Sequence, residues 1–425
     1  MNKNIFLVIL NYLKLRRGVV KQSSRININL MKDYNKQLVL RTIQKYGPIS
    51  RVEIANKIDL SRPSVSEIVS ILIDEQWIEE KAMERKVRGR QPIPLDINKE
   101  KKVMIGLEIG AYRTSIIVSN LRAEILFEKQ IEMDLLKDPN DMIVYLGQEI
   151  RLIAEEYSAQ QIEVLGIGVG MHGLVDTQNG TNIFAPNLGW RNIEIKSILE
   201  SETDLMVLID NDCNSAALAE MWFGQGKEET NFISVIVDYG VGASIINNGS
   251  ILRGNHHITG QIGHVTIDPD GPLCSCGNYG CLETLTSETA IIKMIKRQLK
   301  IGRKSQILNI QSEIDDLSIE DFYEAVNQGD ELCVQIAKEV GRNLGLGFAI
   351  LINLFGPKFI VLGGSLTKIS HILLPEIKTI ILLKVMGEDA KETPIVTSAL
   401  GNDLYTIGAA SLIVEEIFSL PKPNK

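Results

Sequence analysis

Cysteine is concentrated in one short stretch of this chain. Three of its five cysteines lie within eight residues, in GHVTIDPDGPLCSCGNYGCLE at 263–283. A disulfide would leave one of the three thiols over, whereas three thiolates and one imidazole form the closed four-ligand set that structural zinc prefers. We therefore predict that the segment folds around Zn²⁺, with free thiols in a turn as the alternative. The predicted ligands are His264, Cys274, Cys276 and Cys281.

The N-terminus does not have the pattern of an export signal. Its apolar run covers only Ile5 to Leu10 and is followed by charges without a small-residue cleavage site. The run is also far too short to cross a bilayer, and a chain of 425 residues can bury an ample core without disulfides. We expect a cytoplasmic protein that does not contact a membrane. Residues 1–30 form an N-terminal extension to which the sequence assigns no role.

Charge is distributed unevenly along the chain. Residues 31–102 hold fifteen basic and eleven acidic side chains, whereas residues 103–425 hold twenty-four basic and forty-two acidic ones. A mildly basic head in front of an acidic body suits a protein that contacts nucleic acid with one end only.

Residues 31–95 have the pattern of a winged helix-turn-helix domain. An apolar stripe of helical period in 35–47 is followed by Ser50, which is placed to cap a short second helix. Ser61 can cap a third helix, whose exposed N-terminal end would reach base edges in the major groove. The alternative is a three-helix module that binds protein. The residues of this helix that we expect to contact DNA are Ser61, Arg62, Ser64 and Ser66.

The segment RGRQP at 88–92 is predicted to belong to the wing of this domain. Two arginines that flank a glycine, and are held extended by the following proline, can lie along a narrow minor groove where the negative potential is strongest. We expect Arg88 and Arg90 to contact DNA, with a solvated linker as the alternative. Residues 96–102 would then connect the head to the body.

The body, residues 103–425, alternates strand-like and helix-like segments, which predicts an α/β fold. Two similar hairpins, each with a glycine-containing turn, are expected at 103–120 and 231–249, and strand and helix material follows each of them. This repetition predicts a duplicated fold of two lobes. A ligand would bind in the cleft between the lobes.

Residues 35–415 resemble the ROK family, which comprises repressors, unassigned reading frames and sugar kinases of the actin-like ATPase fold. The resemblance implies that the body is a two-lobed sugar-binding domain. A head with an RGRQP wing is found in the repressor branch of the family and not in the kinase branch, so the resemblance is to the repressors. The stretches that carry it are GVGMHGLVD at 168–176, NLGW at 187–190, DNDCNSAALAE at 210–220, GQIGH at 260–264 and CSCGNYGCLE at 274–283.

The resemblance also implies an inducer site. Asn211 and Asp212 match a pair that hydrogen-bonds sugar hydroxyls, and Asp212 stands at the position of the kinases' catalytic base. His264 matches a histidine that binds zinc and also donates to a sugar oxygen, and Glu283 matches a further hydroxyl acceptor. Gln261 replaces the usual glutamate, so that an acceptor is kept, a donor is added and the charge is lost.

Two loops depart from the pattern of the family's kinases. Their first hairpin carries an aspartate, paired glycines and Thr-Lys, whereas this chain has Glu108-Ile109-Gly110-Ala111-Tyr112-Arg113. Their second loop is Gly-Thr-Gly, whereas this chain has Asp238-Tyr239-Gly240. Added bulk and negative charge would obstruct phosphate binding, on which phosphoryl transfer depends. We therefore expect no kinase activity.

Together these features predict a repressor of a carbohydrate-utilisation operon that responds to a sugar. It would bind operator DNA as a homodimer or tetramer, and its inducer would come from the sugars that relatives handle, which include xylose, glucose and N-acetylated hexosamines. One alternative is a ROK-family sugar kinase with an accessory DNA-binding head. Another is a regulator whose acidic body docks a protein partner.

Overall fold

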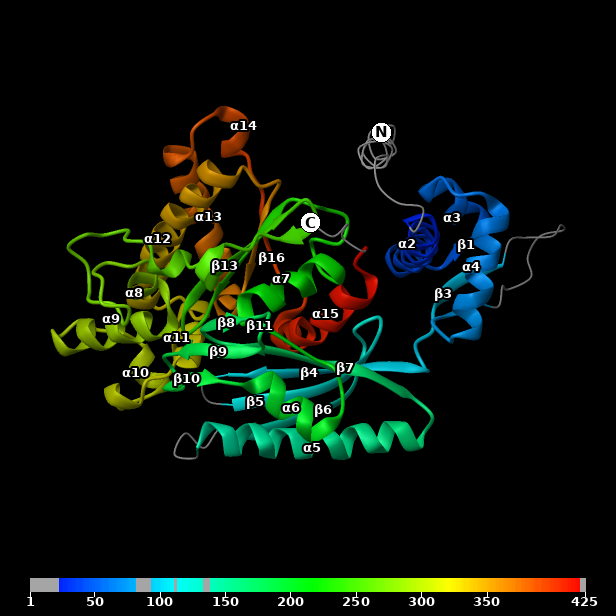
Figure 1. Ribbon diagram of the computed structural model, residues 1–425. Helices are drawn as coiled ribbons and strands as arrows, with labels where there is room; N and C mark the ends of the chain where they lie inside the picture. The colour runs from blue at the N-terminus through cyan, green and yellow to red at the C-terminus, as the bar shows by residue number, and fades with distance from the viewer. Residues whose placement is uncertain (1–22, 82–92, 111–112, 133–137, 421–425) are drawn as a thin grey trace. The chain divides into compact units, whose positions relative to one another are not determined.

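The computed structural model describes residues 23–81, 93–110, 113–132 and 138–420, with side chains from residue 31 onward. The chain forms two compact units, a head that includes residues up to Asn98 and a body of residues Lys99–Glu416 (Figure 1). Within the described residues, no helix is both long and apolar enough to cross a membrane.

The head is a three-helix unit with a small antiparallel sheet in the order β1-β3-β2. Ser50 accepts a hydrogen bond from the backbone N–H of Glu53, whose carboxylate in turn accepts from the Ser50 backbone, so a capping box begins α3. Val65, Val69 and Leu72 of α4 are fully buried. The elements of the head are α2 (Ser23–Tyr46), β1 (Ile49–Ser50), α3 (Arg51–Ile58), α4 (Arg62–Asp74), β2 (Ile78–Glu80) and β3 (Pro94–Ile97).

Two boundaries of the head differ from the sequence prediction. Helix α2 begins at Ser23 and not near residue 35, because residues 23–46 contain neither glycine nor proline to end it. Strand β3 continues through Ile97, which pairs with Ile78 and is fully buried. The connection between the two units is therefore shorter than the predicted 96–102, since β4 already begins at Lys102.

The first lobe of the body is built on a five-stranded sheet in the order β11-β7-β4-β5-β6. Strands β4, β5 and β6 form an antiparallel meander, and β7 and β11 add in parallel next to β4. The strands are β4 (Lys102–Ile109), β5 (Arg113–Asn120), β6 (Ile125–Glu132), β7 (Glu163–Met171) and β11 (Val207–Asn211).

The second lobe repeats this arrangement in the order β14-β13-β12-β15-β16. Its first three strands are again antiparallel and its last two again parallel to the central strand. The repeat confirms the duplicated α/β fold. The strands are β12 (Phe232–Val237), β13 (Val241–Asn247), β14 (Ser250–Ile251), β15 (Ile360–Gly363) and β16 (Ile395–Thr397).

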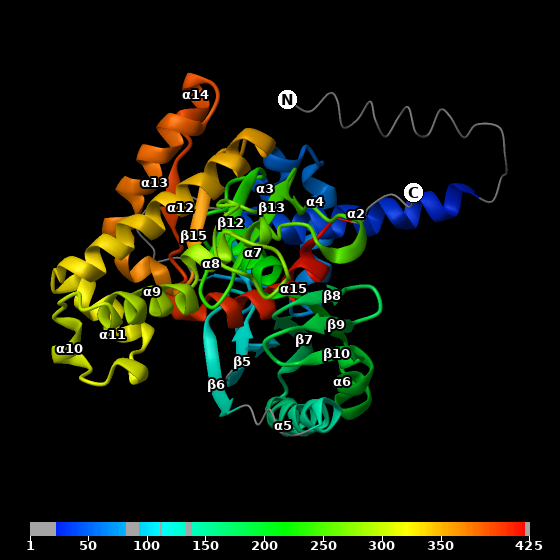
Figure 2. The ribbon, with the colours of Figure 1, turned by 90° about the vertical axis from the view of Figure 1, so that its left-hand side faces the viewer.

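Helices cover the outer faces of both sheets. In the first lobe, α5 (Pro139–Ala159) runs along the sheet and packs with α6 (Ile195–Thr203) (Figure 1). A small sheet of β8 (Leu174–Asp176), β9 (Thr181–Ala185) and β10 (Trp190–Ile193) adjoins this lobe. The helices of the second lobe are α8 (Glu283–Thr286), α9 (Glu288–Lys300), α10 (Ile307–Ile310), α11 (Ile319–Asn327), α12 (Glu331–Phe355), α13 (Ser370–Lys384) and α14 (Glu388–Lys391), seen face-on in Figure 2.

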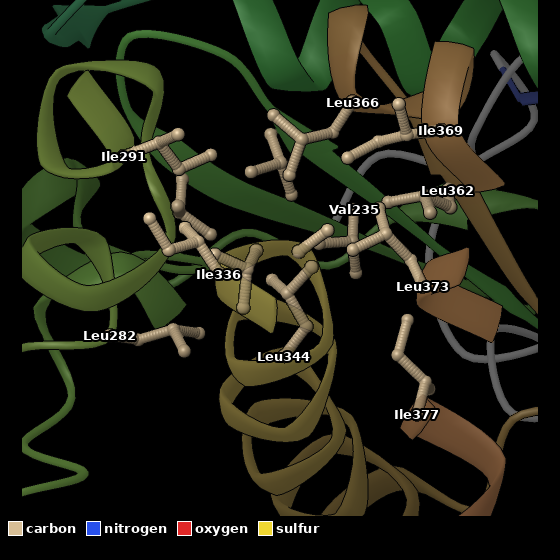
Figure 3. Close-up of a cluster of buried hydrophobic side chains, with 14 of the residues drawn as sticks. Val235, Leu282, Ile291, Ile336, Leu344, Leu362, Leu366, Ile369, Leu373 and Ile377 are labelled. Carbon is tan, nitrogen blue, oxygen red and sulfur yellow. The ribbon is translucent and has the colours of Figure 1, made fainter. Parts of the chain in front are cut away.

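The core of the second lobe forms around α12, against which α13 packs along its length. Leu344 of α12 and Leu373 and Ile377 of α13 are fully buried, and Figure 3 shows them converging with Val235 and Leu362 of the sheet. Burying a side chain of this size contributes about 1.5–3 kcal/mol, so this helix pair is a rigid backing for the strands behind the site.

Two helices connect the lobes by packing across them. Helix α7 (Asp212–Trp222) follows β11 of the first sheet but packs on β12 and β13 of the second. Helix α15 (Leu404–Phe418) follows β16 of the second sheet but packs on the first, where a Cβ on Gly168 would lie 1.8 Å from the Ala409 carbonyl oxygen. Only glycine permits that approach. The lobes therefore meet through two crossing helices beneath the cleft.

Candidate functional site

A cleft of about 1450 Å³ opens in the body and is lined from both lobes. Its polar residues lie at the carboxyl ends of parallel strands: His172 follows β7, Asp212 follows β11, Asp238 follows β12 and Ser365 lies just beyond β15. In α/β sheets ligands bind outside these strand ends. The sheet topology thus brings together groups that are far apart in the sequence.

The five residues predicted to bind an inducer all line this one cleft. Gln261 precedes the short 3₁₀ helix η2 (Ile262–His264), and Glu283 begins α8. Glu283 Oε2 accepts the backbone N–H of Val241 at 3.3 Å, which fixes the carboxylate at the edge of β13. Their role in inducer binding stays a prediction.

Both the oxygen and the nitrogen of the Asn211 side-chain amide form hydrogen bonds within the protein. Its Oδ1 accepts the backbone N–H of Cys213 at 3.0 Å and thereby caps α7. Its Nδ2 donates to the Gly173 carbonyl oxygen at 3.0 Å. One lone pair of Oδ1 and one of the two amide protons are used in this way, so a ligand in the cleft could use the second amide proton or the second lone pair.

Asp212 has a partner for each carboxylate oxygen. Oδ1 accepts the Cys213 backbone N–H at 2.8 Å, and Oδ2 lies 3.3 Å from Nδ1 of His172. The Asp212 hydrogen bond and the charges of Asp212 and Glu283 raise the pKa of His172 against the opposing effect of its burial, which is the largest single influence. His172 is a cleft residue that the sequence analysis did not select, and its position in the GVGMHGLVD stretch was the available signal.

The predicted zinc ligands converge to the geometry that the ion requires. The four donor atoms of His264, Cys274, Cys276 and Cys281 lie within 4.8 Å of one another. Cys276 Sγ and Cys281 Sγ are 3.7 Å apart, and Cys274 Sγ is 3.5 Å from His264 Nδ1. Tetrahedral zinc with ordinary bond lengths requires about 3.8 Å between sulfurs and about 3.5 Å between nitrogen and sulfur. The donor set therefore fits Zn²⁺.

The thiols of this cluster differ in acidity. A hydrogen bond from the Asn278 backbone lowers the pKa of Cys276, whereas burial raises the pKa of Cys281 to about 12. Without a cation the Cys281 thiol would stay protonated at neutral pH, and a bound metal ion would displace that proton. Of the other two cysteines, Cys333 is buried in the core, whereas Cys213 lines the cleft beside Gly242.

Asp238, in the second of the two loops that depart from the kinase pattern, is hydrogen-bonded within the protein. Asp238 Oδ1 accepts the backbone N–H of Ser365 at 2.5 Å, and Oδ2 accepts the hydroxyl proton of Tyr405. Burial raises the pKa of Asp238 in spite of these hydrogen bonds. The N–H at the start of η4 (Ser365–Ile369), which could bind a ligand phosphate, is therefore bound to an internal carboxyl group.

Further carboxyl groups surround this half of the cleft. Burial raises the pKa of Glu108 to about 7, an effect that Arg113 opposes and that the charges of Asp212 and Asp238 reinforce. Glu288 accepts hydrogen bonds from Ser365 Oγ and, at 3.3 Å, from the Tyr323 hydroxyl, and burial raises its pKa as well. Of the other predicted obstructions, Tyr239 is exposed and lines the cleft, whereas Ala111 and Tyr112 lie outside the described residues.

The candidate DNA-binding residues lie at the exposed N-terminal end of α4. Ser61 caps the helix by accepting the Ser64 backbone N–H at 3.3 Å, and the two hydroxyls are 2.8 Å apart. Ser66 Oγ donates to the Arg62 carbonyl oxygen at 2.9 Å. The serine hydroxyls thus have local partners, and the exposed guanidinium of Arg62 is the charged group at this end. Arg88 and Arg90 lie outside the described residues.

Family models match both units of the chain. Residues 104–416 match the model of the ROK family. Residues 32–79 match a model described as winged helix-turn-helix DNA-binding. The two matched ranges correspond to the body and the head.

Two relatives match along almost their whole length. A xylose repressor of Caldicellulosiruptor bescii is 31% identical over 396 residues, which cover 93% of this chain and 99% of the relative. The DNA-binding transcriptional dual regulator NagC of Escherichia coli is 33% identical over 387 residues, which cover 91% of this chain and 94% of the relative.

Solved structures of two kinds are similar to this one. A ROK family transcriptional regulator, a homolog of the E. coli MLC protein, superposes with a TM-score of 0.80 at 31% identity and covers 92% of this chain and 97% of its own. A ROK family glucokinase from Streptomyces griseus, in complex with glucose and AMPPNP, has a TM-score of 0.65 at 27% identity and covers 73% of this chain and 98% of its own. The regulator extends over more of this chain than the kinase does.

Proposed function

The chain belongs to the ROK family, and from this premise we propose that it is a transcriptional repressor of a carbohydrate-utilisation operon whose operator affinity is controlled by a sugar bound in the body. The head binds operator DNA through α4 and the wing, and the chain acts as a homodimer. Xylose is the first candidate inducer, because a xylose repressor matches 93% of the chain.

One observation carries this proposal: a helix-turn-helix head and a cleft lined from two lobes occur in one chain, and in that cleft a carboxyl group takes a backbone N–H that a phosphate could otherwise use. Asp238 takes the Ser365 N–H, and Glu108 and Glu288 add acidic groups nearby. Bringing a triphosphate here would require displacing Asp238 and would place like charges together. A sugar can still enter the part of the cleft at Asp212 and Glu283. The cleft could therefore bind a sugar without phosphorylating it.

Coupling to DNA follows from the two-lobed architecture. A sugar in the cleft would contact His172 and Asp212 at the strand ends of the first lobe, and Gln261, His264 and Glu283 in the second. A ligand that touches both sides favours one arrangement of the lobes, and it shifts their equilibrium by its difference in affinity for the two arrangements. In a homodimer, a change in lobe arrangement changes the spacing of the two heads, to which operator binding is sensitive.

We infer that Zn²⁺ in the His264 cluster is structural and supports the sugar site. All four coordination positions would be filled by protein, which leaves none for a water nucleophile. Coordination through Nδ1 directs Nε2 of His264 away from the metal, where it can donate to a sugar oxygen. The same loop continues through Cys281 to Glu283, so the metal fixes two sugar-binding groups together.

A second candidate function is a sugar kinase with an accessory DNA-binding head. The similarity to the Streptomyces griseus glucokinase favours it, as does Asp212 at the position of the catalytic base. The hydrogen bond from the Ser365 N–H to Asp238 argues against it. A coupled assay that detects ADP formation from ATP with xylose, glucose or N-acetylglucosamine separates the two functions, and we expect no turnover.

The decisive experiment joins DNA and sugar binding in one measurement. The purified chain would select its binding sequence from a random DNA library, and gel-shift titrations on that sequence would be repeated with each of the three sugars. We expect one sugar to release the DNA. Sequence-specific binding that no sugar weakens, together with sugar phosphorylation, would establish the kinase instead.

A further inference from the structure

A segment of the second lobe, residues 252–260, reaches toward the first lobe beside the cleft. Its two ends are held on β13 by backbone hydrogen bonds, from the Leu252 N–H at 2.8 Å and to the Gly260 carbonyl oxygen at 2.9 Å. Between these ends, the 3₁₀ helix η1 (Asn255–His257) contacts β8, which adjoins the first lobe, and Ile258 lines the cleft. We call this segment the strap.

Packing alone does not hold the strap in place. Residues 252–258 are exposed, and His256 and His257 have positive φ angles of 67° and 59°. A residue with a Cβ adopts this conformation at a cost, and the conformation persists only where the surrounding structure maintains it. The strap therefore needs a fixed contact with its surroundings.

Arg253 provides such a contact through a buried carboxylate of the first lobe. Its Nη2 donates to Oδ2 of Asp210, the β11 residue that immediately precedes the pair expected to bind the sugar. The Asp210 side chain is only 2% exposed, and its Oδ1 accepts the Asn211 N–H at 2.7 Å and Nδ2 of Asn214 at 2.9 Å. A buried carboxylate is costly without a charged partner. The ion pair therefore fixes the strap to the strand that carries the candidate sugar-binding residues.

We propose that Arg253 is a positioning residue of the sugar site. By pairing with Asp210 it holds the strap, together with Ile258 and the adjoining Gln261, in the arrangement that binds the sugar. Neither Arg253 nor Asp210 lines the cleft, so the pair acts on the sugar through the strap and β11. This inference rests on the proposed sugar-binding function and adds to it a residue that lies outside the cleft.

Loss of the ion pair should weaken sugar binding without removing a group that lines the cleft. A protein whose binding-competent arrangement is only partly populated binds its ligand with an affinity reduced by that fraction. Coupling of this kind typically changes affinity about 5- to 150-fold, so we expect the dissociation constant of an Arg253→Met variant to rise by a factor in this range. The rise should be smaller in Arg253→Lys, which keeps the charge but not the planar guanidinium.

The test is isothermal titration calorimetry of the full-length, zinc-loaded chain with D-xylose, D-glucose and N-acetylglucosamine, followed by comparison of the variants with the sugar that the wild type binds most tightly. Arg151→Met is the matched control. Arg151 forms an ion pair with Glu202 within the first lobe, its side chain is 48% exposed against 47% for Arg253, and it does not line the cleft. This variant should bind the sugar as the wild type does.

Two further measurements separate positioning from a general loss of stability. In an Asp210→Asn background, Arg253→Met should weaken sugar binding less than it does in the wild type, because the charge with which the arginine pairs is already absent. Hydrogen exchange measured without sugar should be faster in Arg253→Met than in the wild type at the backbone amides of the strap, and it should be unchanged in β4 and β12.

The outcomes that would overturn the inference are distinguishable. If Arg253→Met binds the sugar as tightly as the wild type, or weakens binding equally in the Asp210→Asn background, the inference is wrong while the sugar-binding function stands. Faster exchange throughout the body would show that the ion pair only stabilises the fold, and would reject a positioning role. If the wild type binds none of the three sugars, the proposed function fails and the inference fails with it.

Discussion

Replacing Asp212 by asparagine should uncouple the sugar response from DNA binding. The substitution is nearly isosteric, and an amide oxygen can still accept the Cys213 N–H that Oδ1 now receives. What is lost is the negative charge at Oδ2, which faces the cleft beside His172. The end of α4 that we propose binds the operator belongs to the other unit of the chain, so the affinity of the variant for DNA should not change.

The expected loss of sugar affinity follows from the weakened hydrogen bond between a sugar hydroxyl and the side chain at position 212. A hydrogen bond from a sugar hydroxyl to a carboxylate contributes about 1.5–3 kcal/mol, which corresponds to a factor of about 10 to 150 in the dissociation constant. We expect the sugar concentration that half-releases the operator to rise by that factor. Loss of the charge at the first residue of α7 costs about 0.3–1 kcal/mol of stability, too little to unfold a body with two extensive cores.

The assay is a gel-shift titration of operator DNA with the wild type and the Asp212→Asn variant, each over a range of sugar concentrations. Asp141→Asn serves as the matched control, because Asp141 is an exposed aspartate in the first turn of α5, and no residue of that helix lines the cleft. The control should release DNA as the wild type does. Thermal melts of all three proteins verify folding.

The reasoning is refuted if Asp212→Asn releases the operator at the wild-type sugar concentration. The cleft would then not be the inducer site. A variant that binds operator more weakly without sugar would show instead that Asp212 maintains the DNA-binding arrangement, and it would contradict the separation of the two ends.

Three further predictions concern the metal, the DNA and pH. Metal analysis should find about one zinc per chain in the wild type and clearly less in Cys276→Ser, since three protein ligands hold zinc less tightly than four; full occupancy in the variant would remove Cys276 from the ligand set. Arg62→Ala should weaken DNA binding and reduce the slope of log K against log salt by about one unit, whereas an unchanged slope would place Arg62 away from phosphate. Glu108 has a pKa raised by burial from 4.5 to about 7, so the folded state binds its proton more tightly than the unfolded state and stability is lost as pH rises through this window. Between pH 5 and pH 8, the free energy of unfolding measured with urea should fall by about 2–3 kcal/mol more in the wild type than in Glu108→Gln. If the free energy of unfolding of the two proteins changed equally with pH, this prediction would be wrong.

Local patterns in the sequence were sufficient for the fold class and for the His/Cys cluster that could hold a metal ion. Hairpins and strands that end in glycine follow from apolar periodicity over a few residues, and the two hairpins at 103–120 and 231–249 appear as β4-β5 and β12-β13. The candidate metal ligands could be selected because three of them lie within eight residues, and a loop of that length keeps them close together.

Local patterns did not predict the end of the head, because that boundary depends on the pairing of strands that are distant in the sequence. The predicted linker began at residue 96 because nothing local distinguishes Asp96 and Ile97 from a connection. In the structure Ile97 pairs with Ile78 across the wing and is fully buried. Pairing of this kind is decided by the hydrophobic surface that the three helices of the head present, which a short window of sequence does not contain.

The chemistry of the cleft was decided by tertiary structure. Its polar side chains form hydrogen bonds over long separations in the sequence: His172 with Asp212 over 40 residues, Asp238 with Ser365 over 127 and Asp238 with Tyr405 over 167. The sequence determined which side chains stand at the ends of strands. Only the order of strands in two sheets, joined by the crossing helices α7 and α15, placed those ends around one cavity, because the carboxyl ends of parallel strands share an edge regardless of their distance along the chain.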